Sequence, residues 1–169
     1  GTIIKEFLKN ADNLVLSVSS TTRKPREGEV HGVNYFYITR DEFEKDVKDG
    51  KFIEWAEFGG NLYGTNKNRI QEVLDSGKNI LLEIEVQGAK QVKEKMPEAV
   101  LIFILPPSRE ELENRLRGRG TETEEAIQKR LAAIALESQE SEHYDYKVVN
   151  DILEQAVEEV GKIYEANKG

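Results

Sequence analysis

The 169-residue chain contains no cysteine, only one methionine and one tryptophan, and begins with Gly1 rather than methionine. The lack of cysteine excludes disulfide scaffolds and cysteine-ligated metal centres. The longest apolar runs, such as residues 100–105, are far shorter than the ~18 residues that a membrane-spanning helix needs. No signal-peptide pattern is recognisable. We therefore expect a soluble, cytoplasmic protein without a membrane partner.

Acidic side chains exceed basic ones by 32 to 24, which gives a formal net charge of −8. This excess argues against an indiscriminate coat on nucleic acid, so nucleic acid is not expected as a partner. It leaves room for local basic pockets that bind small anions. The apolar share of 38% is sufficient for a packed core, and the length suits one domain. Oligomeric state cannot be predicted from these features.

Helical and strand patterns alternate along the chain. Strands are predicted at 14–19, 35–38, 80–84, 100–105 and 146–149, and a polar loop at 20–34. Helices are predicted near 3–8, 39–50, 70–77, 88–95 and 153–164, with two more after Ser108 and Thr121. Thr39 with Glu42, Ser108 with Glu111 and Thr121 with Glu124 are the predicted capping pairs.

One stretch differs from the rest. Phe52–Phe58 and Asn61–Thr65 flank the pair Gly59-Gly60, which predicts an antiparallel hairpin. The remaining alternation predicts an α/β fold in which helices flank a parallel sheet, with residues 35–65 inserted as a small antiparallel patch.

Two clusters of polar residues are candidates for binding. Residues 19–26 combine hydroxyls with Arg23 and Arg26 directly after a predicted strand. Because ligands bind at the carboxyl ends of parallel strands, this cluster suits a phosphate group. A solvated basic loop is the alternative. The hairpin carries carboxylates and hydroxyls that could accept hydrogen bonds from a guanine, although ordinary strand alternation would produce the same pattern.

Two further clusters lie later in the chain. Glu83 and Glu85 lie at the end of a predicted buried strand and, being two residues apart, share one side of it. Paired carboxylates at this place often organise a metal ion, a base edge or a hydroxyl. Arginines at 115, 117 and 119 lie among glycines, and Arg130 follows on the next predicted helix. This pattern is typical of a mobile flap that brings positive charge onto phosphates. A surface of exposed ion pairs is the alternative.

Together the clusters resemble the guanylate kinase family, and the resemblance extends over essentially the whole chain. The stretches that carry it are Ser17–Glu29, Phe52–Ala56, Asn61–Thr65, Arg117–Glu125 and Val148–Asp151. It implies a P-loop kinase-like parallel sheet, a helical lid and transfer of the ATP γ-phosphoryl group to GMP. It also implies Mg²⁺ with ATP, and one domain over 1–169 with a core at 1–33 and 66–169, a lid at about 109–130 and a GMP-binding part at 34–65.

The resemblance also implies roles for individual residues. The residues that it implies for binding the GMP phosphate are Arg23, Arg26, Tyr35 and Tyr63. The residues that it implies for contacting the guanine or its surroundings are Ser19, Glu54, Thr65 and Glu85. Glu54 would accept from the ring N–H and the exocyclic amine, a donor pair that adenine lacks. Arg119 and Arg130 resemble the lid arginines that meet the phosphates, and Asn150 resembles the adenine side of the ATP site.

The chain departs from this family at its beginning. No GxxxxGK[ST] motif occurs in it, so the backbone cradle and lysine for the ATP phosphates are missing. Residues 1–4 match the segment that follows that lysine in the family. We therefore expect a fragment that lacks the first strand and the phosphate loop and has little kinase activity by itself.

Two other functions stay open at this point. Guanylate-kinase-like modules in scaffold proteins resemble the enzyme but bind a phosphorylated partner without catalysis. A kinase for another nucleoside monophosphate is the second alternative. It is disfavoured because Glu54 and the set of residues from the Ser19–Arg23 run to Tyr63 match the guanylate kinase pattern.

Overall fold

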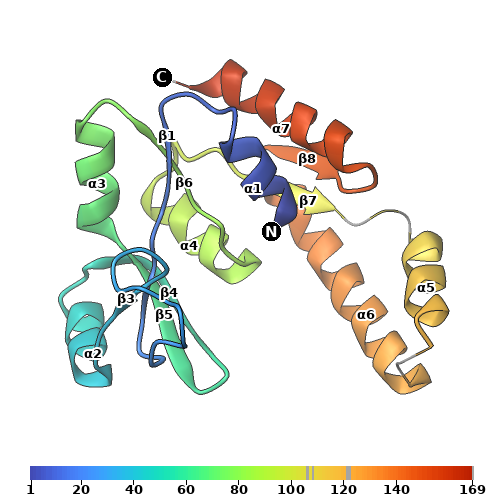
Figure 1. Cartoon of the computed structure of the whole chain (residues 1–169), viewed down its shortest axis with the longest axis horizontal. Helices are drawn as coiled ribbons and strands as arrows, with labels where there is room; N and C mark the ends of the chain where they lie inside the picture. Colours follow the sequence, from blue (N-terminus) through green and yellow to red (C-terminus); the bar gives the residue numbers. More distant parts are fainter. Residues whose placement is uncertain (106, 108, 121–122, 169) are drawn as a thin grey trace. The chain divides into compact units, whose positions relative to one another are not determined.

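The computed structural model describes residues 1–105, 107, 109–120 and 123–168 of the chain (Figure 1). They divide into two compact units, one made of Gly1–Ala11 with Val100–Gly169 and the other of Asp12–Ala99. Both units combine helices with parallel strands, as the predicted α/β class requires. No helix among the described residues is both long enough and apolar enough to cross a membrane.

The Asp12–Ala99 unit contains two sheets. In the first, β1 (Leu14–Leu16) pairs in parallel with β6 (Asn79–Leu81), and Leu14 lies opposite Asn79. The second has the order β3-β2-β5-β4. Its strands are β2 (Ser20–Thr21), β3 (Phe36–Tyr37), β4 (Phe52–Phe58) and β5 (Asn61–Asn66). Strand β2 pairs in parallel with β3 and antiparallel with β5.

The prediction of one strand over 14–19 followed by a loop from Ser20 was wrong. The parallel pairing stops at Leu16, and the chain then joins the second sheet at Ser20. Ser20 and Thr21 are both buried, and the Thr21 hydroxyl donates to the Leu62 carbonyl at 2.9 Å. A strand whose buried side chains are polar and internally hydrogen-bonded resembles a loop in the sequence.

The predicted hairpin is confirmed, with both turn glycines at positive φ, 59° at Gly59 and 82° at Gly60. Helix α2 (Arg40–Lys48) lies beside it (Figure 1) and begins where the Thr39 side chain accepts from the Glu42 N–H at 3.1 Å, as predicted. The buried residues between them are Phe43, Phe52 and Leu62.

Two helices cover the other part of this unit, α3 (Lys67–Asp75) and α4 (Val86–Lys95). Ile53, Ile70 and Val92 form the buried core between them and the strands. Strand β6 ends at Leu81, three residues before the predicted end. Glu83 and Glu85 therefore lie outside the strand and are exposed, so the predicted pair on one side of a buried strand was wrong.

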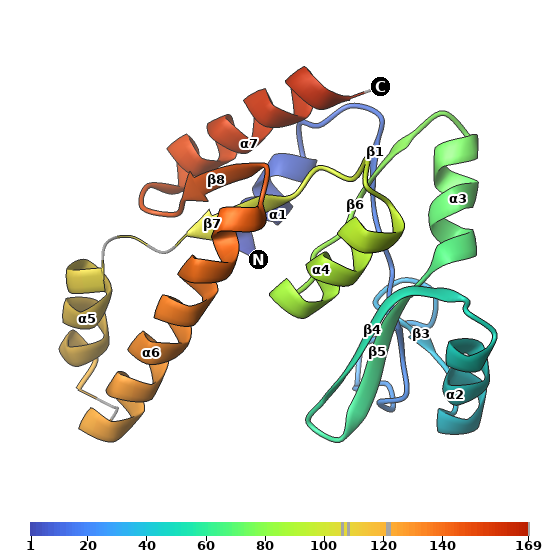
Figure 2. The same cartoon turned by 180° about the vertical axis from the view of Figure 1, so that it is seen from behind.

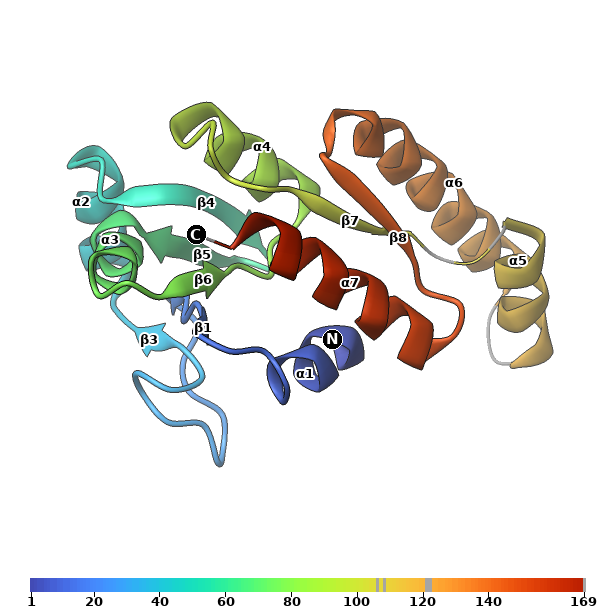
Figure 3. The ribbon, with the colours of Figure 1, turned by 90° about the horizontal axis from the view of Figure 1, so that it is seen from above.

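In the other unit, β7 (Ile102–Leu105) pairs in parallel with β8 (Tyr146–Val149). Helix α1 (Thr2–Leu8) lies beside α7 (Leu153–Asn167) (Figure 3). The rings of Phe7 and Tyr164 meet there edge to face, with their centroids 5.6 Å apart. A short 3₁₀ turn, Ser141–His143, precedes β8.

Helices α5 (Arg109–Gly118) and α6 (Glu124–Glu140) form a helical hairpin in the same unit (Figure 2). Leu116, Ile127 and Leu131 are buried between them. The Thr123 hydroxyl accepts from a first-turn amide of α6, the Ala126 N–H at 3.2 Å. Thr121 and the predicted cap Ser108 lie outside the described residues.

The apolar runs predicted a sheet buried on both faces. In the described part of the chain, the strands near these runs form one parallel pair in each unit, β1–β6 and β7–β8. Most of their side chains are half-buried or exposed. A strand in a two-stranded pair has one neighbour, so it buries less of its surface than an interior strand of a wide sheet.

Candidate functional site

A pocket of about 170 Å³ lies in the Asp12–Ala99 unit. Three of the predicted site residues, Ser19, Tyr35 and Thr65, line it together with Asn34 and Glu83. Leu16, Leu82 and Ile84 supply its apolar wall. An apolar pocket with a few polar groups is the usual form of a small-molecule site.

Next to this pocket is a buried carboxylate. Glu54 lies opposite Thr65 in the β4–β5 register, and the Thr65 hydroxyl donates to Glu54 Oε1 at 2.6 Å. Glu54 is 7% exposed. Burial raises the pKa of Glu54, and the charge of Glu85 raises it further, whereas Thr65 and Lys95 act in the opposite direction. A buried carboxylate with one oxygen held by a hydroxyl is suited to accept hydrogen bonds from a ligand.

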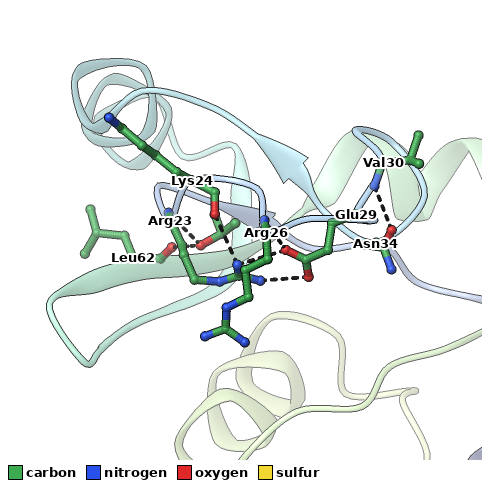
Figure 4. A network of polar contacts seen from close by, with 8 residues as sticks. Arg23, Lys24, Arg26, Glu29, Val30, Asn34 and Leu62 are labelled. Carbon is green, nitrogen blue, oxygen red and sulfur yellow. Dashed lines mark hydrogen bonds and ion pairs between the residues drawn. The ribbon is translucent and has the colours of Figure 1, made fainter.

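A basic and aromatic cluster follows β2 (Figure 4). Arg23 Nη1 and Nη2 donate to the two carboxylate oxygens of Glu29 at 2.9 and 3.0 Å. The Arg23 guanidinium also lies over the Tyr35 ring, 5.3 Å from its centroid, and the Tyr35 and Tyr63 rings are 6.0 Å apart. Tyr35 therefore belongs to both the pocket and this cluster.

Arg23 and Glu29 shift each other's pKa. The hydrogen bond with Glu29 raises the pKa of Arg23, and Tyr63 raises it further. The bond from Arg23, reinforced by the Arg26 N–H at 2.7 Å, lowers the pKa of Glu29 to about 2. The Tyr37 hydroxyl is buried, and burial raises its pKa. Its interaction with the Glu29 carboxylate raises the pKa of Tyr37 further and helps to lower that of Glu29.

Arg26 differs from Arg23. Its side chain is exposed, and Figure 4 shows its guanidinium directed away from Glu29. No other side chain in the described ranges forms an ion pair or hydrogen bond with it. Arg23 is thus held in place, while the Arg26 guanidinium is available to an anion.

The arginines of the helical hairpin fall into two groups. Arg115 pairs with Glu111 at 2.6 Å and with Asp151 at 3.4 Å. Arg117 pairs with Glu113 at 2.9 Å and also with Glu124, which raises the pKa of Arg117 and lowers that of Glu124 to about 2. The alternative of an ion-paired surface therefore holds for these two.

The two predicted lid arginines behave differently. Arg119 and Arg130 are exposed. Among the described side chains neither forms an ion pair or hydrogen bond. Both guanidiniums are therefore available to an anionic ligand.

The remaining predicted position is Asn150, which is exposed at the end of β8 and donates its N–H to the Leu105 carbonyl at 2.7 Å. In the described part of the chain no group of three or more His, Cys, Asp or Glu side chains is arranged to hold a metal ion. A dedicated metal site built by protein side chains is therefore not found there.

Three residues with evident contacts to the site were not singled out from the sequence. Glu29 holds Arg23. The Arg69 guanidinium lies 3.4 Å from the Phe36 ring centroid and donates to Ser20 Oγ at 3.0 Å. Gly88 lies against Glu54. Only the short spacing between Arg23 and Glu29 was visible in the sequence, since the other contacts join distant segments.

Comparison with known proteins gives a consistent result. The guanylate kinase family model matches residues 2–167. A guanylate kinase of Clostridioides difficile is 51% identical over 99% of this chain and 82% of its own length. One of Clostridium tetani is 49% identical over 99% and 80%. The crystal structure of guanylate kinase from Anaplasma phagocytophilum superimposes with a TM-score of 0.74 at 38% identity, covering 99% of this chain and 81% of that one.

Proposed function

The chain belongs to the guanylate kinase family, and we propose from this that the Asp12–Ala99 unit holds GMP as it receives the γ-phosphoryl group of ATP. The observation that carries the proposal is the buried Glu54–Thr65 pair next to a pocket that shares Tyr35 with the Arg23 cluster. One end of this site suits a base, and the other suits a phosphate.

At the base end, Glu54 accepts hydrogen bonds from the guanine ring N–H and the exocyclic amine. Thr65 and Ser19 line the pocket beside it. Glu85 acts through its charge on Glu54 rather than by lining the pocket. Adenine offers no such donor pair, so the Glu54 carboxylate would lack the hydrogen bonds from the base and would keep only the one from Thr65. A buried acceptor left in this way costs about 1–3 kcal/mol. This difference accounts for selection of a guanine nucleotide.

At the phosphate end, Arg23, Arg26 and the hydroxyls of Tyr35 and Tyr63 bind the GMP phosphate. Arg23 has five N–H donors, and the pair with Glu29 uses both terminal nitrogens while fixing the plane of the guanidinium. Arg26, without a partner in the described ranges, supplies the second positive charge. The two guanidiniums and the two hydroxyls together supply hydrogen-bond donors for the phosphate oxygens.

For the transfer itself we propose that Arg119 and Arg130 contact the migrating phosphoryl group when the lid closes. Phosphoryl transfer depends on positioning and charge stabilisation rather than on covalent catalysis. Asn150 lies on the adenine side of ATP. Magnesium arrives with ATP, because Mg²⁺ is commonly held by substrate phosphates and water with few protein ligands. The cytoplasmic location expected from the sequence stays a prediction.

The binding-module alternative is not favoured, since the relatives that cover nearly the whole chain are named guanylate kinases. Competition between GMP and a phosphoserine peptide separates the two functions. If the protein is a kinase, GMP is expected to bind and the peptide is not expected to compete with it. Displacement of GMP by the peptide at similar concentrations would favour a binding module.

The residue roles are tested by GMP titration calorimetry on single variants. Glu54→Gln and Arg23→Met are each expected to raise the GMP dissociation constant by roughly 10- to 100-fold, because each removes a charge-assisted hydrogen bond. Arg40→Met is the matched control, since Arg40 is half exposed and, among the described residues, pairs with Glu44, Glu57 and the Gly60 carbonyl. Wild-type affinity in either site variant would contradict the assignment.

A further inference from the structure

Gly88 is a buried glycine in the first turn of helix α4, three residues after the N-cap Glu85. Its φ is not in the positive range, so its backbone conformation does not require glycine. Glycine inside a helix is less stable than alanine. A reason for glycine here must therefore come from the space around it.

That space is occupied by the carboxylate of Glu54. A β-carbon added at Gly88 would lie 2.8 Å from Glu54 Oε2 and 3.4 Å from the carboxyl carbon. The first distance is closer than real β-carbons approach other atoms. Either the helix or the carboxylate would have to move.

Helix α4 lies beside strand β4 (Figure 3). Side-chain hydrogen bonds hold the helix to the strand, so the helix is less free to move than the Glu54 carboxylate. The Gln91 side-chain amide donates to the Trp55 carbonyl and accepts from the Trp55 N–H, both at 3.2 Å. One turn later, Lys95 Nζ donates to the Phe52 carbonyl at 3.1 Å. Positions 88, 91 and 95 share one face of α4, so the face that presents Gly88 is tied to the strand that carries Glu54.

Two contacts fix the position of the Glu54 carboxylate. Thr65 holds Oε1 at 2.6 Å, whereas Oε2 receives no hydrogen bond from the described residues and lies against Gly88. A methyl group at position 88 would push Oε2 and rotate the carboxylate away from its present plane. Oε2 is the oxygen left for a ligand to use.

We infer that Gly88 is a specificity-determining position, whose missing side chain sets the place of the Glu54 carboxylate and thereby the recognition of guanine. The inference rests on the proposed role of Glu54 in accepting from the guanine ring N–H and amine. Gly88 touches no substrate and acts as a positioning residue. Its loss is expected to reduce discrimination at the base while leaving the phosphate cluster unchanged.

The test compares Gly88→Ala with Gly161→Ala in the full chain, by calorimetric titration with GMP and with IMP. Gly161 is a matched control because it also lies inside a helix, α7, and an added β-carbon there meets no atom within 4 Å. IMP has the same phosphate and ring N–H but lacks the exocyclic amine. Melting temperatures of both variants are recorded alongside.

Gly88→Ala is expected to raise the GMP dissociation constant by roughly tenfold and the IMP value by less, without a matching fall in melting temperature. Gly161→Ala is expected to change neither dissociation constant. In a Glu54→Ala background, where no carboxylate is left to displace, Gly88→Ala is expected to cost no further GMP affinity.

Glu54→Gln separates failure of the inference from failure of the proposed function. If Glu54→Gln leaves GMP binding unchanged, the role of Glu54 itself is wrong. If Glu54→Gln weakens GMP binding but Gly88→Ala does not, the inference about Gly88 is overturned. If Gly88→Ala weakens the binding of GMP and of IMP equally and also lowers the melting temperature, Gly88 has only a structural role. This result would also overturn the inference about Gly88.

Discussion

The side chains of Arg23 and Glu29 form a two-point ion pair, with N···O distances of 2.9 and 3.0 Å. The same carboxylate accepts the Arg26 N–H at 2.7 Å. Both side chains are shielded, with exposed fractions of 14% and 20%. One acidic residue thus organises the turn that presents both arginines, a role that net charge alone does not reveal.

The Glu29 contribution to stability is expected to disappear in acid. Its pKa is about 2 in the folded chain against an ordinary value of 4.5. The anion therefore stabilises the fold fully above about pH 4.5, and the stabilisation is lost as the pH falls toward about 2. Urea unfolding of wild type and Glu29→Gln across this range measures it. A difference between the two that does not change with pH would contradict this explanation.

GMP affinity is expected to weaken in acid through Glu54. Burial raises the pKa of Glu54, so the carboxylate takes up a proton at a higher pH than an exposed glutamate and then loses acceptor capacity. Affinity should fall as the pH decreases through that raised pKa. Calorimetry on wild type and Glu54→Gln isolates this effect, because ionisation of the GMP phosphate is common to both. Parallel pH profiles for the two proteins would refute it.

Arg130→Ala is expected to lower kcat on the order of a thousandfold while changing the GMP KM little, since a lid arginine acts mainly in the transition state. Steady-state kinetics with ATP and GMP as substrates measures both constants. Lys129→Ala is the neighbouring control, because Lys129 is 77% exposed and its ion pair with Glu125, at 3.7 Å, is long. An unchanged kcat in Arg130→Ala would remove the residue from the mechanism.

Arg69→Met is expected to destabilise the fold by about 1–3 kcal/mol, since it removes the contact with the Phe36 ring and the hydrogen bond to the buried Ser20. Burial also lowers the pKa of Arg69, which agrees with a partly desolvated guanidinium. Chemical denaturation gives the free energy of unfolding. Arg40→Met, which removes exposed ion pairs, should cost at most ~1 kcal/mol. Equal effects of the two substitutions would contradict the account of Arg69.

Local signals predicted several elements well. The Gly59-Gly60 turn between alternating segments and the Thr39 cap both act within a few residues, and both are confirmed. The prediction failed where burial and local pattern disagree. Buried Ser20 and Thr21 form a strand because distant Leu62 and Arg69 satisfy their hydroxyls, which a short window of sequence cannot show.

The candidate site was predictable to a similar extent. Ser19, Tyr35 and Thr65 meet at the pocket, and Arg23, Tyr35 and Tyr63 meet in one cluster. Their catalytic and binding roles stay predictions. The supporting residues Gly88 and Gln91 were missed, because their contacts with β4 span more than thirty positions. A glycine that is required because a side chain would not fit does not change the hydrophobic periodicity of the sequence.

Calorimetric titration of the chain with GMP and with AMP is the most direct test of guanine recognition at the Glu54 pocket. GMP is expected to bind at a single site, with AMP weaker by at least about 100-fold, because adenine lacks the pair of N–H donors that guanine offers to the Glu54 carboxylate. Equal affinity for GMP and AMP, or no GMP binding, would contradict the proposed function.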